Sequence, residues 1–284
     1  MLSLSTPAKW ILSGEHAVIR GFPAIVFPLH HFQCTLLFEP NTNELTCDCQ
    51  THDGLDSFVL GLIHKVIQKL NIKIYGAITI INTIPIGQGL GFSASLAVNI
   101  ARLLQKLGHI KQPEILKTAT FIENIIHLTS SGIDVHGVYS NQVLHYQNGQ
   151  GKPINHYNLP NLWLHPTEQV GITSSCIKNV SQLHKNFPEK AALIDQKMGT
   201  TTEQLLEVIQ NPHHHDWVRS IQQAQECFRD WGLITDCLDQ AMNSLSQQGC
   251  LALKPTGSGK GGFLIGLWPD HHHPKNAIPL QIKR

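Results

Sequence analysis

The sequence predicts a folded protein that combines helices and strands in two domains. Its 284 residues suffice for two modest domains or one large one. Hydrophobic residues make up 42% of the chain and charged residues 14%, a composition typical of folded rather than disordered proteins. A stretch rich in glycine, asparagine and proline at 148–160 separates two differently patterned parts. We therefore expect domains at 1–158 and 159–284.

Short segments rich in β-branched and aromatic residues predict strands, and apolar residues at helical spacing predict helices. The helix over 93–107 is typical: its apolar residues recur at intervals of three and four, and Gly108 closes it. A further helix opens at Pro113 and ends at the polar turn TSSGID. The remaining expected helices cover 56–70, 191–210 and 216–248, and the expected strands cover 73–81, 141–146, 162–165 and 263–268.

Charge and cysteine content exclude several classes of function. The formal net charge is +1 and no long basic run occurs, so we expect neither nucleic acid nor a membrane surface as a partner. Seven cysteines without C-x-x-C spacing indicate neither a disulfide scaffold nor a structural zinc site. The N-terminus lacks the pattern of a signal peptide, and no apolar run is long enough for a membrane span. We expect a soluble, cytoplasmic protein that acts on a small molecule.

Two triple histidines, at 213–215 and 271–273, are the one compositional oddity. Adjacent histidines point in different directions and rarely close one metal shell, so we interpret both as solvated loops.

The segment PIGQGLGFSAS, residues 85–95, places three glycines on alternate positions ahead of a helix. Bare backbone N–H groups beside a helix N-terminus bind phosphate well, although such a loop taken alone is more typical of a simple turn that reverses the chain. The Walker A pattern is not met, because Gly259-Lys260 is followed by glycine. A dinucleotide-binding pattern, G-x-G-x-x-A, is met, but no strand ending in an acidic residue follows at the required distance.

Three motifs occur in order: PAKWILSGEHAVIRGFPAIVFPL (7–29), PIGQGLGFSAS (85–95) and KPTGSGKGG (254–262). Together they resemble the signature motifs of the GHMP small-molecule kinases, and GEHAVIRG is most similar to the mevalonate kinase family. SSGIDVHGVYSNQVLHYQNG (130–149) resembles the stretch around that family's catalytic aspartate. The resemblance implies an α+β, two-domain GHMP kinase fold, with an N-terminal domain like ribosomal protein S5 domain 2 and a ferredoxin-like C-terminal domain.

The resemblance also implies residue roles. Asp134 would accept the proton of the substrate hydroxyl, and Lys9 would lie beside Asp134. Ser93 and Glu123 would hold Mg²⁺, for which hard oxygen ligands are suited. ATP would be bound by the glycine loop, through Gly87, Gln88, Gly89, Leu90, Gly91, Phe92, Ser93 and Ala94.

Each role has a structural alternative. Ser93 could be an ordinary N-cap, Glu123 an exposed helix carboxylate and Asp134 a turn-forming residue. Glu15, His16 and Thr173 would face the acceptor, but His16 could instead be a hydrogen-bonded structural imidazole.

Four positions depart from the family pattern. Phe92 replaces a small serine, and we expect its ring to pack under the loop, away from the phosphates. Lys260 stands where the third motif normally has small residues, and Val135-His136 replaces asparagine and a small residue.

The implied activity is ATP- and Mg²⁺-dependent phosphorylation of the C5 hydroxyl of mevalonate in isoprenoid biosynthesis. A homodimer would also fit the family. Two alternatives stay open at this point: another GHMP kinase, acting on phosphomevalonate, homoserine or a sugar, and a non-catalytic nucleotide-binding regulator.

Overall fold

The computed structural model describes residues 1–41, 44–50, 54–127, 130–155, 159–167, 169, 171, 173–211 and 216–280. The described residues form two β-sheets together with α-helices and short 3₁₀ helices, so the predicted α+β class is confirmed. The chain forms two compact units: unit 1 comprises 1–9, 28–85 and 91–141, and unit 2 comprises 10–27, 86–90 and 142–284. The boundary expected near residue 158 falls outside the described residues and stays a prediction.

The sheet of unit 1 is built around β4, Gly76–Asn82, whose residues are alternately buried and half-buried. The second half of β2, Ala24–Pro40, runs antiparallel to β4 from Cys34↔Asn82 to Pro40↔Gly76. On the other edge β3, Leu45–Cys49, runs parallel to β4. The long first strand β1, Leu2–Ser13, pairs with β2 and brings Lys9 into this unit.

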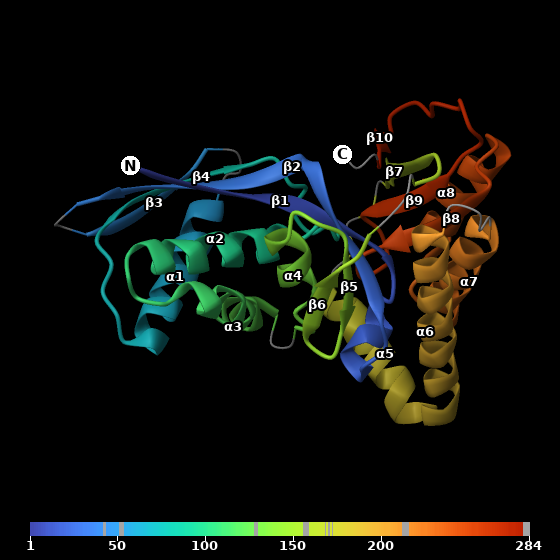
Figure 1. Cartoon of the computed structure of the whole chain (residues 1–284), viewed down its shortest axis with the longest axis horizontal. Coiled ribbons are helices and arrows are strands. Elements are labelled where there is room, and N and C mark those ends of the chain that lie inside the picture. The colour runs from blue at the N-terminus through green and yellow to red at the C-terminus, as the bar shows by residue number, and fades with distance from the viewer. Residues whose placement is uncertain are drawn as a thin grey trace. The chain divides into compact units, whose positions relative to one another are not determined.

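Four α-helices and a 3₁₀ turn complete unit 1, and in Figure 1 the helices lie on one side of its strands. The predicted helix after the glycine loop is confirmed as α2, and the one opening at Pro113 becomes a 3₁₀ turn followed by α3. The predicted polar turn TSSGID instead contains the start of a helix, α4, which the left-handed Gly132 precedes. The elements are α1 Leu55–Leu70, α2 Phe92–Lys106, η2 Gln112–Glu114, α3 Ile115–His127 and α4 Ile133–Tyr139.

Unit 2 contains most of the remaining strands. The first residues of β2 pair with β5, Leu144–Gln147, which forms a hairpin with β6, Gln150–Pro153. The strand predicted at 141–146 therefore begins three residues late. A second sheet is antiparallel throughout, in the order β10-β7-β9-β8. Its strands are β7 Leu162–Pro166, β8 Ala252–Thr256, β9 Phe263–Leu267 and β10 Ile278–Pro279.

The helices of unit 2 pack around one apolar cluster that includes Met198, Phe228 and Trp231. The single helix predicted at 216–248 is wrong: the structure has two, α7 and α8, because the left-handed Gly232 ends α7 and Thr235 caps α8. A second cluster joins α8 to the antiparallel sheet. The elements are η1 His16–Arg20, α5 Thr173–Asn186, α6 Pro188–Gln210, α7 Trp217–Asp230 and α8 Asp236–Gln247.

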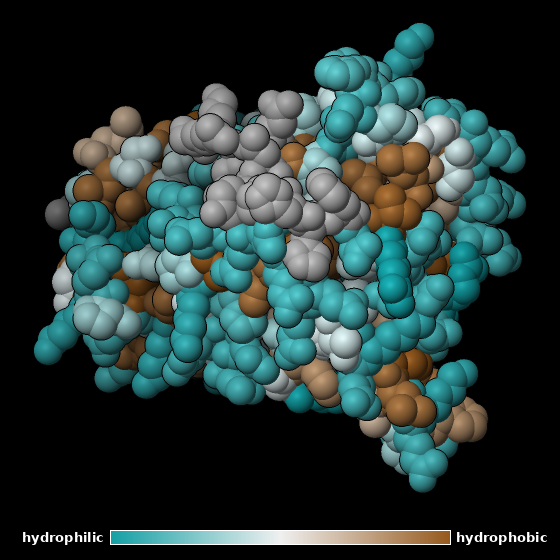
Figure 2. Space-filling view, turned by 45° about the vertical axis from the view of Figure 1, so that its right-hand side comes forward, coloured by the Kyte–Doolittle hydropathy of each residue, from teal (hydrophilic) through white to brown (hydrophobic). Residues whose placement is uncertain are grey.

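Most of the face drawn in Figure 2 is hydrophilic, with apolar groups in patches among polar ones. Large apolar side chains that are exposed include Phe58, Phe187 and Leu193. Scattered exposure of this kind is normal for folded proteins. Within the described ranges, no helix is both long and apolar enough to cross a membrane.

Candidate active site

Lys9 and Asp134 form the centre of a polar cluster in unit 1. Lys9 lies on β1, Asp134 lies in the first turn of α4, and Lys9 Nζ is 2.8 Å from Asp134 Oδ1. The side chain of Lys9 is 1% exposed and that of Asp134 is 33% exposed. A buried ammonium needs such a partner. The carboxylate is therefore the member of the pair that solvent, or a bound molecule, can reach.

Gly91 leaves room for this lysine. A Cβ at Gly91 would lie 2.9 Å from Lys9 Cγ and 3.2 Å from Val138 Cγ1, and its φ of 84° is one that side chains rarely adopt. The third glycine of the loop is thus required by packing around Lys9 as well as by the turn.

Glu123 lies on α3, in the same unit, and is 2% exposed. Ser130 donates a hydrogen bond to Glu123 Oε2 at 2.6 Å. Burial, and after it the negative charge of Asp134, raises the pKa of the Glu123 carboxyl to about 7. Glu123 is therefore a buried carboxyl group near the carboxylate of Asp134. The alternative that Glu123 is an exposed helix carboxylate is wrong.

Ser93 lies in the first turn of α2, where its Oγ is 2.9 Å from Nε2 of His127 at the end of α3. The N-cap of α2 is Gly91 and not Ser93, so the hydroxyl is directed to another element instead of capping its own helix. Burial lowers the pKa of His127, which favours the neutral imidazole.

These donors suit Mg²⁺. A serine hydroxyl and a buried carboxylate are hard oxygen ligands, and the neighbouring carboxylate of Asp134 adds negative charge that a divalent cation would neutralise. In the described part of the chain no group of three or more His, Cys, Asp or Glu residues could hold a metal ion. Mg²⁺ commonly takes few protein ligands and completes its shell with phosphates and water.

The glycine loop is divided between the two units: residues 86–90 belong to unit 2, and residues 91–141 belong to unit 1. Gly87, Gly89 and Gly91 have φ of 73°, 79° and 84°. Leu90 and Ala94 are fully buried. Behind the loop, the first turn of α2 offers the N–H groups that a helix leaves without intrahelical partners.

Close packing explains part of the loop's glycine content. A Cβ on Gly89 would lie 3.0 Å from the Thr256 carbonyl oxygen, and one on Gly262 would lie 2.5 Å from that of Gln88. The backbone of residues 256–262, in the third sequence motif, therefore lies against the backbone of residues 88–89 in the glycine loop. This close contact requires glycines in both motifs, independently of any ligand.

Phe92 is 7% exposed, and its ring is part of the buried core. The expectation that the ring packs inside the protein agrees with this burial, while its position relative to a bound phosphate stays a prediction.

Glu15, in unit 2, contacts the ammonium of Lys254, and both side chains are almost completely buried. Lys254 also donates to the carbonyl oxygens of Pro255 at 2.6 Å and Ile11 at 3.3 Å, and its Nζ lies 5.3 Å from the centroid of the Phe228 ring. The Glu15 carboxylate is thus held by a cation from the third sequence motif.

His16 is 5% exposed and packs edge-on against Phe228 and Trp231. Its Nε2 lies 2.9 Å from the carbonyl oxygen of Ser258, which requires the N–H on this nitrogen. Burial lowers the pKa of the His16 imidazole to about 4, so it is neutral at pH 7.

Ser258 connects the residues expected to face the acceptor. Its hydroxyl donates to Thr173 Oγ1 at 3.4 Å, while its carbonyl accepts from His16. Thr173 begins α5, so the structure brings Thr173 and His16 to the same loop residue. The roles assigned to Glu15, His16 and Thr173 stay predictions.

The three departures from the family pattern outside Phe92 have ordinary structural environments. Lys260 is half-buried with φ of 60°, and its N–H donates to the Leu233 carbonyl at 2.8 Å. Val135 is buried in α4, and His136 Nδ1 is 2.9 Å from the Gly132 carbonyl oxygen. No contact in the described residues explains a preference for one acceptor at these positions.

Of the two triple histidines, 213–215 lies outside the described residues. In the other, His272 stacks on Trp268 with ring centroids 4.3 Å apart, and His273 meets Trp163 edge-on.

Sequence reasoning missed four residues of the two clusters. The partners of Ser93 and Glu123, His127 and Ser130, follow Glu123 closely on the chain. Lys254 and Ser258 belong to KPTGSGKGG, whose glycines and Lys260 alone were considered in the sequence. Polar residues inside a recognised motif were the available signal.

Residues 57–141 match the family model "GHMP kinases N terminal domain". The mevalonate kinases of Thermococcus onnurineus and Pyrococcus furiosus are 27% and 26% identical to this protein, each over 94% of this chain and 89% of its own length. The crystal structure of L. major mevalonate kinase in complex with R-mevalonate has a TM-score of 0.77 at 22% identity, and covers 95% of this chain and 88% of that one. Lactococcus lactis galactokinase, complexed with galactose, has a TM-score of 0.76 at 15% identity, covering 94% and 85%.

The matched domain and the similar mevalonate kinases support membership of the GHMP kinase superfamily, and the chain has the two-domain GHMP kinase fold. Its relatives indicate an enzyme that transfers a phosphoryl group to a hydroxyl group. Within that superfamily it is most like mevalonate kinase. Because a galactokinase shares the fold almost equally well, the sequence relatives and not the fold make this distinction.

Proposed function

We propose that this protein uses ATP and Mg²⁺ to phosphorylate the C5 hydroxyl of mevalonate, giving 5-phosphomevalonate for isoprenoid biosynthesis. The observation that carries the proposal is the Lys9–Asp134 ion pair, with its cation buried and its carboxylate accessible, beside Glu123 and Ser93 in one unit. The similarity to mevalonate kinases along nearly the whole chain supports the choice of acceptor.

In the reaction, the acceptor oxygen forms a bond to the γ-phosphorus, the bond between that phosphorus and the bridging oxygen of ADP breaks, and the hydroxyl proton moves to Asp134. Lys9 fixes the position of this carboxylate and stabilises negative charge on the transferred group. Ser93 and Glu123 would hold Mg²⁺, which when bound supplies charge neutralisation for the phosphates. Loss of the proton from Glu123 would accompany its use as a ligand, since its pKa is about 7.

ATP phosphates would be held by backbone N–H groups of residues 87–94 and the first turn of α2. On the acceptor side, His16 and Thr173 would provide hydrogen bonds and Glu15 a fixed carboxylate. These roles rest on the family resemblance together with the contacts of each residue within its own unit.

Two alternatives predict different behaviour. Another GHMP kinase would prefer phosphomevalonate, homoserine or a sugar as acceptor. A non-catalytic regulator would bind ATP without turnover, but such a protein has no need of a buried lysine paired with an accessible aspartate.

The purified protein should be incubated with Mg-ATP and each of mevalonate, phosphomevalonate, homoserine and galactose, with ADP release measured in parallel. We expect turnover with mevalonate alone. Turnover with a different acceptor would replace the proposed substrate, and ATP binding without any turnover would favour the regulator.

The proposal includes the two domains 1–158 and 159–284, a cytoplasmic location and a homodimer. Size-exclusion chromatography with light scattering tests the last of these.

A further inference from the structure

One face of α6 contacts the segment 13–22, which contains Glu15 and His16. The residues on this face, Asp195, Met198, Gly199 and Thr202, recur at the spacing of one helix face, and all four are buried. Unit 2 contains both this face and the segment from Ser13 to Phe22.

Three residues of the segment, Ser13, Phe22 and Arg20, contact this face. The hydroxyls of Thr202 and Ser13 are 2.7 Å apart. At Gly199 an added Cβ would lie 2.4 Å from Cδ1 of Phe22, so the glycine allows this ring to approach the helix. Glycine inside a helix is less favourable than alanine, and this close contact with Phe22 explains why a glycine occurs here.

The third contact is an ionic one at Asp195, whose side chain is 1% exposed. Both carboxylate oxygens accept from Arg20: Oδ2 from Nε, and Oδ1 from Nη2 at 2.7 Å. His184 on α5 lies 3.0 Å from Oδ2. Arg20 Nη2 also donates to the backbone carbonyl of His16 at 3.0 Å. A planar guanidinium that contacts a carboxylate through two nitrogens is held in one orientation.

We propose that Asp195 is a positioning residue for the acceptor side of the reaction: through Arg20 it fixes the turn η1, and with it Glu15 and His16. The inference rests on the proposed function, because it needs Glu15 and His16 to face the acceptor. It adds a residue that lies outside all three sequence motifs.

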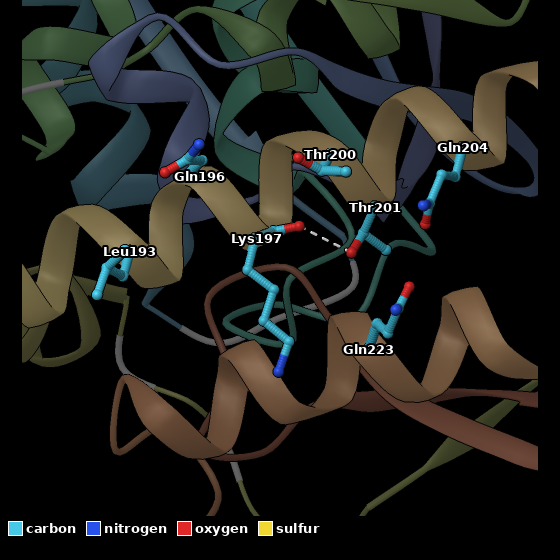
Figure 3. A pocket seen from close by; sticks show the side chains of 7 residues that line it. All are labelled: Leu193, Gln196, Lys197, Thr200, Thr201, Gln204 and Gln223. Carbon is cyan, nitrogen blue, oxygen red and sulfur yellow. Dashed lines mark hydrogen bonds between the residues drawn. The ribbon is translucent and has the colours of Figure 1, made fainter.

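The contacts of Arg20 distinguish a positioning role of Asp195 from a general contribution to the stability of α6. Arg20 contacts the backbone of His16 itself, so loss of the Asp195 carboxylate releases the turn directly. The other side of α6 provides a matched control. There Lys197, Thr201 and Gln204 face Gln223 of α7 around a hollow of about 300 Å³ (Figure 3). Lys197 pairs with Glu226 in an exposed ion pair.

The first experiment measures amide hydrogen exchange, which requires no activity. Val18 N–H donates to the Gly14 carbonyl and Gly21 N–H to that of Val18, so these two amides report on the turn. We expect Asp195→Asn and Arg20→Gln each to speed exchange at Val18 and Gly21 by on the order of tenfold, and Lys197→Gln to leave it unchanged. Unchanged exchange in both variants would overturn the proposal.

The second experiment measures steady-state kinetics. Asp195→Asn and Arg20→Gln should each raise KM for mevalonate on the order of tenfold and leave KM for ATP within about twofold. Because both act through one contact, the double variant should show the same rise and not about a hundredfold. Equal rises for both substrates, or multiplying effects, would show a merely structural role.

Two precautions keep the outcomes distinct. If Asp195→Asn does not fold, Arg20→Gln still tests the inference, since the Arg20 side chain is 30% exposed. If the unmodified enzyme does not turn over mevalonate, the proposed function fails on that measurement, whereas the exchange experiment still decides whether Asp195 holds the turn.

Discussion

The ammonium of Lys9 and the carboxylate of Asp134 lie 2.8 Å apart, with the lysine 1% and the aspartate 33% exposed. The asymmetry has a chemical consequence. The side chain of Lys9 packs closely against the backbone of Gly91, whereas the carboxylate of Asp134 is partly exposed. A base in this position can take a proton while its partner holds it in place.

Asp134→Asn should therefore reduce turnover by on the order of 10³-fold and leave ATP binding nearly intact, because the amide keeps the shape but cannot accept the proton. ADP release measures the first effect and calorimetric titration of Mg-ATP the second. A fully active variant would remove Asp134 as the base.

Lys254→Met should destabilise the protein by roughly 3–5 kcal/mol, because it removes the ammonium that the buried Glu15 carboxylate contacts. Urea denaturation followed by circular dichroism measures this change. Adding Glu15→Gln to the variant should recover part of the loss. Lys197→Gln, which breaks an exposed pair, should cost about 1 kcal/mol or less. Equal costs for the two lysines would contradict the account of Lys254.

Phe92→Ser tests whether the ring blocks ATP or supports the loop. Since Phe92 is 7% exposed, we expect a loss of about 3 kcal/mol in the free energy of unfolding and no gain in ATP affinity. Thermal or urea unfolding and nucleotide titration give both numbers. A tighter ATP complex with unchanged stability would show that the ring obstructs the nucleotide.

His165 predicts a particular pH dependence of stability. Its Nε2 accepts a hydrogen bond from Trp268 Nε1 at 2.9 Å, and burial lowers its pKa from 6.5 to about 4. The unfolded chain therefore binds a proton as pH falls through 6.5 while the folded protein does not. The stabilisation is complete above pH 6.5, declines as pH falls towards 4, and the decline ends below that value.

His165→Gln provides the comparison, since glutamine can accept the same hydrogen bond but does not titrate. Between pH 7 and 4 the unmodified protein should lose on the order of 3 kcal/mol more than the variant. Urea unfolding at several pH values measures the difference. Parallel pH curves would show that His165 is not buried as the structure describes.

Much of unit 1 was predictable from local patterns. The strand before the glycine loop is predicted by its short run of β-branched and aromatic residues, and the helix after the loop by its apolar spacing; they appear as β4 and α2. The family motifs also predicted that Lys9 would lie beside Asp134, as it does. The catalytic roles of Lys9 and Asp134 remain predictions, because the distance between the two side chains does not measure activity.

Other elements give weak local signals. β2 is buried continuously at its start and alternately later, because its two halves pair in different units, and this mixed pattern has no single period. α5 buries only Cys176 and Val180, too few residues for a recognisable apolar face. The contacts of Asp195 with Arg20 and of Lys254 with Glu15 join distant parts of the chain, and residue spacing carries no information on such pairs.

Identification of the product tests the central claim most directly. The protein should be incubated with Mg-ATP and mevalonate, and the product analysed by ³¹P and ¹³C NMR. We predict a phosphomonoester on the C5 oxygen, with one ADP formed per ester, and its loss in Asp134→Asn. A phosphate on another oxygen, or ATP consumed without a mevalonate ester, would contradict the account.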